Sequence, residues 1–199
     1  MGSRLDKRLL VIDIESTCWE PPNTKPHNEI QEIIEVGIAE VDIKELRIIH
    51  NEGLLVKPAL SKVSAFCTKL TTLTQEQVDK GISYKEVCNQ LERVYNSPNV
   101  TWASWGDFDR KQFQKDSNIK TVRYPFGPRH INIKNLFSVI YGLDKELGLD
   151  AALEYLGMKL EGTHHRGVDD ARNIAKVFLH LLKHSRNGCK EASVKSSKD

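Results

Sequence analysis

Two acidic residues, Asp13 and Glu15, stand at the end of a short apolar run and could bind a metal ion. The run at residues 9–14 is rich in β-branched side chains, which predicts a buried strand. Residues two apart on a strand project from the same face, so the two carboxylates would repel each other. A cation or a proton would have to offset that repulsion in a buried site. The alternative is a strand that ends in water with both acids solvated, and the spacing alone does not decide between them.

The segment from His164 to Asp170 contains two histidine–aspartate pairs with the same five-residue offset. In the helix expected at residues 168–184, Asp170 shares a face with apolar side chains such as Ile174, whereas Asp169 shares one with polar side chains. Asp170 is therefore expected to face a sheet, and Asp169 the solvent. An aspartate in the first turn of a helix is also stabilised by free backbone N–H groups, so a capping role is the structural alternative.

A third acidic segment, Asp107 to Asp109, falls between an expected strand at residues 100–104 and an expected helix. Asp109 lies four residues before Phe113 on the inward face of that helix, which favours a buried side chain that could bind a metal. Asp107 precedes the helix and could cap it. The spacing favours Asp109 as the ligand without excluding Asp107.

Strand and helix patterns surround these three segments. Strands are expected at residues 9–14, 36–43, 46–56 and 100–104, the second and third as an antiparallel hairpin. Helices are expected at residues 61–68, 74–80, from Ser83 with Glu86 in capping-box position, and at 108–116, 134–141, 150–156 and 168–184. Residues 122–130, with two prolines and a glycine, are expected to form a loop. The order predicts an α/β domain.

The composition bounds what the chain can do. Its 199 residues fit one domain, which we expect at residues 8–186, between a flexible segment at 1–7 and a disordered polar tail at 187–199. A balance of 29 basic and 27 acidic residues calls for no polyanionic partner by itself. The four cysteines show no CxxC pair or zinc-finger spacing, so a zinc site is not expected. The sequence shows no secretory signal or membrane-spanning apolar run, which predicts a cytoplasmic protein without a membrane partner.

The three acidic segments resemble, in order, the three motifs of the DEDDh nucleases, which are 3′-to-5′ exonucleases. Here the motifs read Asp13-Ile-Glu15-Ser-Thr-Cys, Ser104-Trp-Gly-Asp-Phe-Asp109 and His165-Arg-Gly-Val-Asp-Asp170. Residues 66–78 resemble the linking segment of the Eri1 branch, the histone-mRNA exonucleases. The resemblance spans residues 8–184 and implies an α/β, ribonuclease H-like exonuclease fold, a mixed β-sheet flanked by helices with the acids at one sheet edge.

The resemblance, together with the preference of magnesium for oxygen ligands, implies a site for two Mg²⁺ ions, with Mn²⁺ able to substitute. The expected metal ligands are Asp13, Glu15, Asp109 and Asp170. His165 titrates near neutral pH and would act as the general base, and Glu15 would also contact the terminal 3′ hydroxyl. The residues expected to hold the 3′ end of the substrate are Ser16, Phe66, Leu70, Phe108 and His165, with Trp105 as a further candidate for base stacking.

The function that follows is hydrolysis of phosphodiester bonds in single-stranded RNA or DNA with a free 3′ end. RNA is favoured over DNA, and a two-metal mechanism would release nucleoside 5′-monophosphates. We expect a monomer, and the sequence leaves a protein partner open. Two other functions stay open: a non-cleaving RNA-binding or regulatory partner-binding module on the same fold, and a nuclease for very short oligonucleotides.

Overall fold

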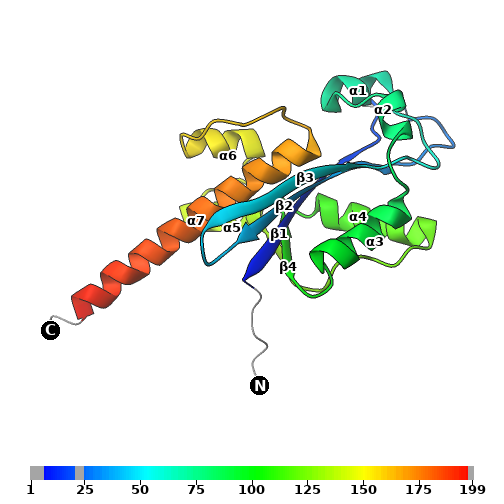
Figure 1. Cartoon of the computed structure of the whole chain (residues 1–199). Coiled ribbons are helices and arrows are strands. Elements are labelled where there is room, and N and C mark those ends of the chain that lie inside the picture. Colours follow the sequence, from blue (N-terminus) through cyan, green and yellow to red (C-terminus); the bar gives the residue numbers. More distant parts are fainter. Residues whose placement is uncertain (1–6, 21–24, 197–199) are drawn as a thin grey trace.

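In the described part of the chain, residues 7–20 and 25–196, a five-stranded mixed sheet runs through the middle of the computed structural model (Figure 1). In spatial order its strands are β3 (Arg47–Leu55), β2 (Ile33–Asp42), β1 (Arg8–Ser16), β4 (Thr101–Ser104) and β5 (His130–Asn132). β2 pairs antiparallel with both β1 and β3, whereas β1, β4 and β5 run parallel. This topology confirms the expected mixed sheet.

The hairpin of β2 and β3 forms as predicted. Asp42 closes its turn by accepting hydrogen bonds from the amides of Lys44 and Glu45, at 2.8 and 2.9 Å. β5 lies outside the predicted strands. Its three residues are too few and too mixed in polarity to show a strand pattern, and it forms as the next parallel partner of β4.

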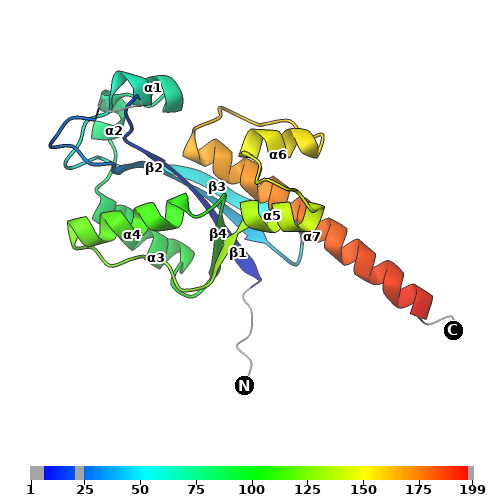
Figure 2. The same cartoon turned by 180° about the vertical axis from the view of Figure 1, so that it is seen from behind.

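Helices cover both faces of the sheet (Figure 2). One face carries α3 (Tyr84–Tyr95) and α4 (Phe108–Lys120), and the other carries α5 (Ile133–Tyr141), α6 (Leu149–Tyr155) and α7 (Gly167–Ser196). Two short helices, α1 (Ala65–Thr71) and α2 (Gln75–Asp79), lie together at one end of the sheet. The predicted capping box starts α3, because Ser83 and Glu86 each accept a hydrogen bond from the other's backbone amide.

The last helix, α7, is longer than the sequence predicts. The prediction ends it at residue 184 and places a disordered tail at 187–199, whereas the helix continues to Ser196. Alanine, lysine and glutamate beyond residue 184 favour helix, and an interior glycine costs only about 1 kcal/mol relative to alanine. The helix therefore extends past the predicted end at residue 184, and the disordered tail expected at 187–199 stays a prediction; residues 197–199 and 1–6 lie outside the described residues. Within the described ranges, no helix has the length and apolar content to cross a bilayer.

Side chains alternate along β1 between the two faces of the sheet. Val11 packs in an apolar cluster with α5, α6 and α7, and Ile12 packs in a second cluster with α3 and α4. Asp13 and Glu15 continue the row of Val11. Both carboxylates therefore leave the carboxyl end of the central strand on the side covered by α7.

A buried ionic cluster ties the start of β2 to α4. Glu32, which is fully buried, accepts hydrogen bonds from the amides of Ala59 and Leu60 at 3.0 and 2.8 Å. Lys120 lies 3.0 Å from Glu32 and 2.6 Å from Asp116. The cluster satisfies two buried carboxylates with one cation, which is how such charges are tolerated inside a protein.

Candidate active site

A cavity of about 320 Å³ opens at the carboxyl ends of β1 and β4. Ligand sites in α/β sheets occur at this edge, where loops and helix starts converge. The cavity contains all four predicted acids and the predicted histidine. Its lining includes Asp13, Glu15, Trp105, Phe108, Asp109, Leu149, Asp150, His164, His165 and Asp170.

Three of the acids meet between β1 and α7. One carboxylate oxygen from each of Asp13, Glu15 and Asp170 lies within 4.8 Å of the other two. Asp170 is 4% exposed, which confirms that it faces the sheet. Asp169 points elsewhere, because its carboxylate accepts a hydrogen bond from the Thr163 amide at 2.9 Å. The period of the strand and the phase of the helix together bring the three carboxylates to one point.

The fourth acid, Asp109, enters from the first turn of α4. β4 pairs with β1 only as far as Val11, and beyond that point the Ile14 amide donates to Oδ1 of Asp109 at 3.0 Å. Asp107 stays outside the cavity and pairs with Arg110 at 3.0 Å. It occupies the N-cap position without making a side-chain cap bond, so the expected capping role is wrong; its backbone is helical rather than extended.

Burial, helped by the charges of neighbouring acids for Asp13 and Glu15, raises the pKa values of the clustered acids. Burial, with the charges of Asp170 and Glu35, raises the pKa of Glu15 to about 9. Burial and the charge of Asp109 raise the pKa of Asp13 well above its usual value. Burial raises the pKa of Asp109 to about 7, although the Ile14 amide partly opposes the shift. Such a cluster favours any ligand that brings positive charge.

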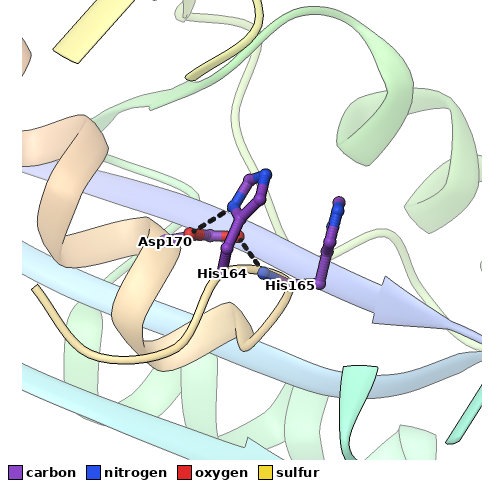
Figure 3. Close-up of side chains that lie close together, drawn as sticks. All are labelled: His164, His165 and Asp170. Atoms are coloured by element: carbon purple, nitrogen blue, oxygen red, sulfur yellow. Dashed lines mark hydrogen bonds and ion pairs between the residues drawn. The ribbon is translucent and has the colours of Figure 1, made fainter. Parts of the chain in front are cut away.

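The rings of His164 and His165 stand side by side with centroids 4.0 Å apart, and the His164 ring is the one next to Asp170 (Figure 3). His164 Nδ1 lies 3.2 Å from one carboxylate oxygen of Asp170, and the His165 backbone amide donates to the same oxygen at 2.9 Å. Figure 3 shows the His165 ring standing clear of Asp170. Burial and the neighbouring His164 charge lower the pKa of His165, so its imidazole is neutral at pH 7.

The His165 backbone adopts φ of 62°, in the left-handed region. This conformation costs a residue with a Cβ about 1–2 kcal/mol. Strain of this kind persists where the surrounding contacts hold the backbone in place. Here the hydrogen bond from the His165 amide to Asp170 contributes to that hold.

The predicted substrate residues fall into two places. Phe108, which is 48% exposed, lines the cavity together with Trp105. Phe66 and Leu70 line a separate hollow on α1 with Lys69. The structure therefore does not bring these two groups into one pocket.

The predicted Ser16 lies at the end of β1, outside the cavity lining. It is buried, and its hydroxyl accepts a hydrogen bond from the Gln31 side chain at 2.9 Å. Its carbonyl accepts a 3.5 Å hydrogen bond from the thiol of Cys67, which ties α1 to this end of the strand. Ser16 therefore adjoins Glu15 at the end of β1 without lining the cavity, and its hydroxyl can still donate a hydrogen bond.

Two residues of the cavity, Asp150 and His164, and one buried acid beside it, Glu35, are absent from the predicted site. Asp150 stands at the start of α6, where an acid also suits a helix N-terminus, so its type gives no distinct signal. His164 was weighed only as the partner of Asp169, whereas it pairs with Asp170. Glu35 is an acid in the apolar first half of β2, between Ile34 and Val36, and that exception to the pattern is a signal that could have identified it.

Comparison with known proteins places the chain among nucleases. A family model described as "Exonuclease" matches residues 10–178, from β1 into α7. The 3'-5' exoribonuclease 1 of Rattus norvegicus is 30% identical over 91% of this chain and 54% of its own length. The "Probable 3'-5' exonuclease KapD" of Bacillus subtilis (strain 168) is 30% identical over 85% of this chain and 82% of its own length. The chain thus spans about half the length of the mammalian relative.

A solved structure has the same fold. It is described as the nuclease domain of 3'hExo, a DEDDh family member, bound to rAMP. It superposes with a TM-score of 0.80 at 26% sequence identity and covers 89% of this chain and 92% of that one. The sheet and its flanking helices therefore belong to an architecture already seen in a nuclease.

Proposed function

Because the chain belongs to the exonuclease family, in the DEDDh group near the Eri1 branch, we propose that it is a 3′-to-5′ exonuclease acting on single-stranded nucleic acid. The observation that carries the proposal is the gathering of four acids and a neutral histidine in one cavity. A purely structural cluster would gain nothing from bringing four like charges together at this edge. A site that binds cations and a phosphodiester gains from them directly.

The donor set fits divalent cations. Asp13, Glu15, Asp109 and Asp170 would hold two of them, and carboxylate oxygens favour Mg²⁺, with Mn²⁺ as a substitute. The raised pKa values of Asp13 and Glu15 support this assignment, since two nearby positive charges would reverse them. When bound, the cations would neutralise the phosphoryl oxygens, acidify the attacking water and stabilise the leaving 3′ oxygen.

The chain's own residues would move the proton and hold the substrate. His165, neutral at pH 7, accepts a proton from the water as its oxygen forms a bond to phosphorus. The bond from phosphorus to the 3′ oxygen of the preceding nucleotide breaks, and that oxygen takes a proton. The released product is a nucleoside 5′-monophosphate. Glu15 contacts the terminal 3′ hydroxyl from the end of β1, which selects a free chain end.

Aromatic side chains would hold the terminal nucleotide. Phe108 and Trp105 present rings at the cavity, where a base can stack. Phe66 and Leu70 lie on α1 and would contact the strand further from the scissile bond, and Ser16 would hold the terminal sugar. RNA is the favoured substrate, which is supported by one relative named as an exoribonuclease and by rAMP in a related structure. We propose a cytoplasmic monomer, with a protein partner left open.

The test uses single-stranded RNA and DNA of one sequence, each labelled at the 5′ end, with Mg²⁺. A ladder that shortens from the 3′ end is expected, faster for RNA. A matched RNA with a 3′ phosphate is the control, and it should resist because Glu15 meets no terminal hydroxyl. Internal cuts of a circular RNA, or release of the labelled 5′ nucleotide first, would refute the exonuclease assignment.

A further inference from the structure

A fifth buried acid, Glu35, stands beside the catalytic cluster without belonging to its cavity lining. It is 1% exposed and lies directly opposite Glu15 in the antiparallel pairing of β1 and β2. Like charges in that position destabilise a sheet unless something compensates them. Its charge also contributes to the raised pKa of Glu15. The compensation for Glu35 comes from the chain itself.

Arg166 and the start of α7 supply that compensation. Oε1 of Glu35 lies 3.1 Å from Nη2 of Arg166, and Oε2 accepts from Nε of Arg166 at 3.2 Å and from the Gly167 amide at 2.9 Å. Bidentate arginine–carboxylate pairs are strong and fix orientation as well as distance. The Gly167 amide belongs to the first turn of α7, where a carboxylate is favoured. Both oxygens of Glu35 therefore already have partners.

Arg166 and Gly167, the two residues that Glu35 binds, lie in the sequence between His165 and Asp170. We call their contacts with Glu35 the Glu35 clasp. Arg166 directly follows His165, and its carbonyl accepts a hydrogen bond from the Asp170 amide at 2.8 Å. Glu35 on β2 thus fixes the backbone of residues 166–167. The position of this backbone determines where His165, on one side of it, and Asp170, on the other, are placed. A shift of this segment would displace the side chains of His165 and Asp170 even if neither residue were substituted.

Two glycines seat the same segment against the sheet. A Cβ on Gly37 of β2 would lie 1.8 Å from the carbonyl oxygen of Gly167, so the backbones touch there. A Cβ on Gly167 would lie 3.1 Å from the carbonyl oxygen of Asp13. The segment therefore rests directly on the backbone that carries the first metal-binding acid, and Glu35 locks it at that contact.

We propose that Glu35 and Arg166 are positioning residues that set His165 and Asp170 against Asp13 and Glu15. The proposal rests on the exonuclease function proposed above. Glu35 itself binds no metal, because its oxygens are taken by the guanidinium and the amide. Loss of the clasp should lower the rate of chemistry, since a displacement of about 1 Å at a reacting group can cost on the order of 100-fold.

The test compares Glu35→Gln, Arg166→Gln and Arg166→Lys with a matched control, Glu32→Gln. Glu32 is also a buried glutamate that accepts two backbone amides and pairs with a cation, but it holds the β2 start to α4. Glu35→Gln and Arg166→Gln should lower kcat roughly tenfold or more with KM within about twofold. Arg166→Lys keeps the positive charge but cannot form the bidentate pair, and its kcat should lie between those of Arg166→Gln and the wild type. Glu32→Gln should lose stability and keep kcat.

A second readout monitors the position of His165 by NMR and does not depend on catalytic activity. The imidazole NMR signals of His165 should shift and broaden in Glu35→Gln and Arg166→Gln, and stay in place in Glu32→Gln. This readout also decides the proposal if a wild-type protein proves inactive, in which case it is the exonuclease function that fails.

Three results would overturn the positioning role. Folded Glu35→Gln with wild-type kcat and unchanged His165 signals would do so. A rate recovered at high Mg²⁺ would make Glu35 a metal ligand instead. An equal rate loss in Glu32→Gln would show a general effect of losing any buried glutamate. If Glu35→Gln does not fold, Arg166→Lys and Arg166→Gln give the same comparison, because Arg166 is partly exposed.

Discussion

Asp13, Glu15 and Asp170 repel one another in the metal-free protein, and this repulsion opposes folding. A carboxyl whose pKa is higher in the folded than in the unfolded chain destabilises the fold at every pH above its unfolded value. We therefore expect Asp13→Asn to raise the free energy of unfolding at pH 7.5 in chelator, because the variant removes the buried carboxyl whose ionisation opposes folding. Urea denaturation of the variant and the wild type measures this difference in the free energy of unfolding. A less stable variant would show that Asp13 is compensated without a cation.

His165 should set the acidic limb of the pH profile. Burial and the charge of His164 lower its pKa, opposed by Asp170 and Asp150, so the neutral base persists below pH 6.5 and is lost only in more acidic solution. kcat/KM should therefore rise with pH and level off before neutrality, and His165→Asn should remove that limb along with roughly 100-fold or more of the rate. His180→Gln is the control, since burial also lowers the pKa of His180, which lies on α7 outside the cavity lining. An unchanged limb in His165→Asn would contradict the assignment.

The sequence predicts these acids because each obeys a local period. Asp13 and Glu15 follow from strand alternation, and Asp170 rather than Asp169 from helix phase. Glu35 does not follow, because its partner Arg166 stands 131 positions further along the chain. Only the packing of α7 on β2 reveals that pair. The short-range pattern of the sequence thus identifies which side chains point inward. The partners that these side chains contact depend on tertiary packing.

At the level of elements, local signals place the helix starts better than the helix ends. Ser83 and Glu86 mark the start of α3 in the sequence and form the capping box in the structure. The end of α7 and the short β5 carry no comparable signal, because the first lacks a stop residue strong enough to end a helix and the second depends on β4.

Ser83→Ala should cost about 1 kcal/mol of stability, the usual loss for a removed N-cap. kcat should be unchanged, because α3 packs on the sheet face opposite α7 and contributes nothing to the cavity. Urea denaturation with a parallel rate assay checks both quantities. A fall in kcat in the folded variant would mean that α3 communicates with the site.

At the scale of the whole molecule, metal binding should couple to folding. Under the proposed function, cations would bind the folded cluster and would have no equivalent site in the unfolded chain, so a saturating metal should stabilise the fold, by about 2.7 kcal/mol at 100 times the Kd. Binding requires Glu15, with a pKa of about 9, and Asp109, with a pKa of about 7, to lose protons. Fewer protons are displaced as pH rises. Mn²⁺ should therefore raise Tm more at pH 8 than at pH 6, and Asp13→Asn should weaken the effect; a larger shift at pH 6 would contradict it.

The fold as a whole could be predicted from the sequence, because the patterns for strands, helices and motifs agree with one another along residues 8–184. Alternation predicts the strands, amphipathic phase predicts the helices, and the three acidic motifs fall where a sheet edge requires them. The sequence could not predict that Phe66 and Leu70 line a hollow apart from the cavity of the four acids, because this placement depends on how α1 packs beside the end of β1.

The most direct measurement is shortening of a 5′-labelled single-stranded RNA by wild-type protein and by Asp13→Ala, each with Mg²⁺ and with chelator. The cavity of four acids predicts stepwise shortening from the 3′ end by the wild type with Mg²⁺ alone, at least about 100-fold faster than by Asp13→Ala. Shortening that survives the chelator, or that Asp13→Ala performs as fast as the wild type, would contradict the proposal that this carboxylate cluster is the catalytic centre.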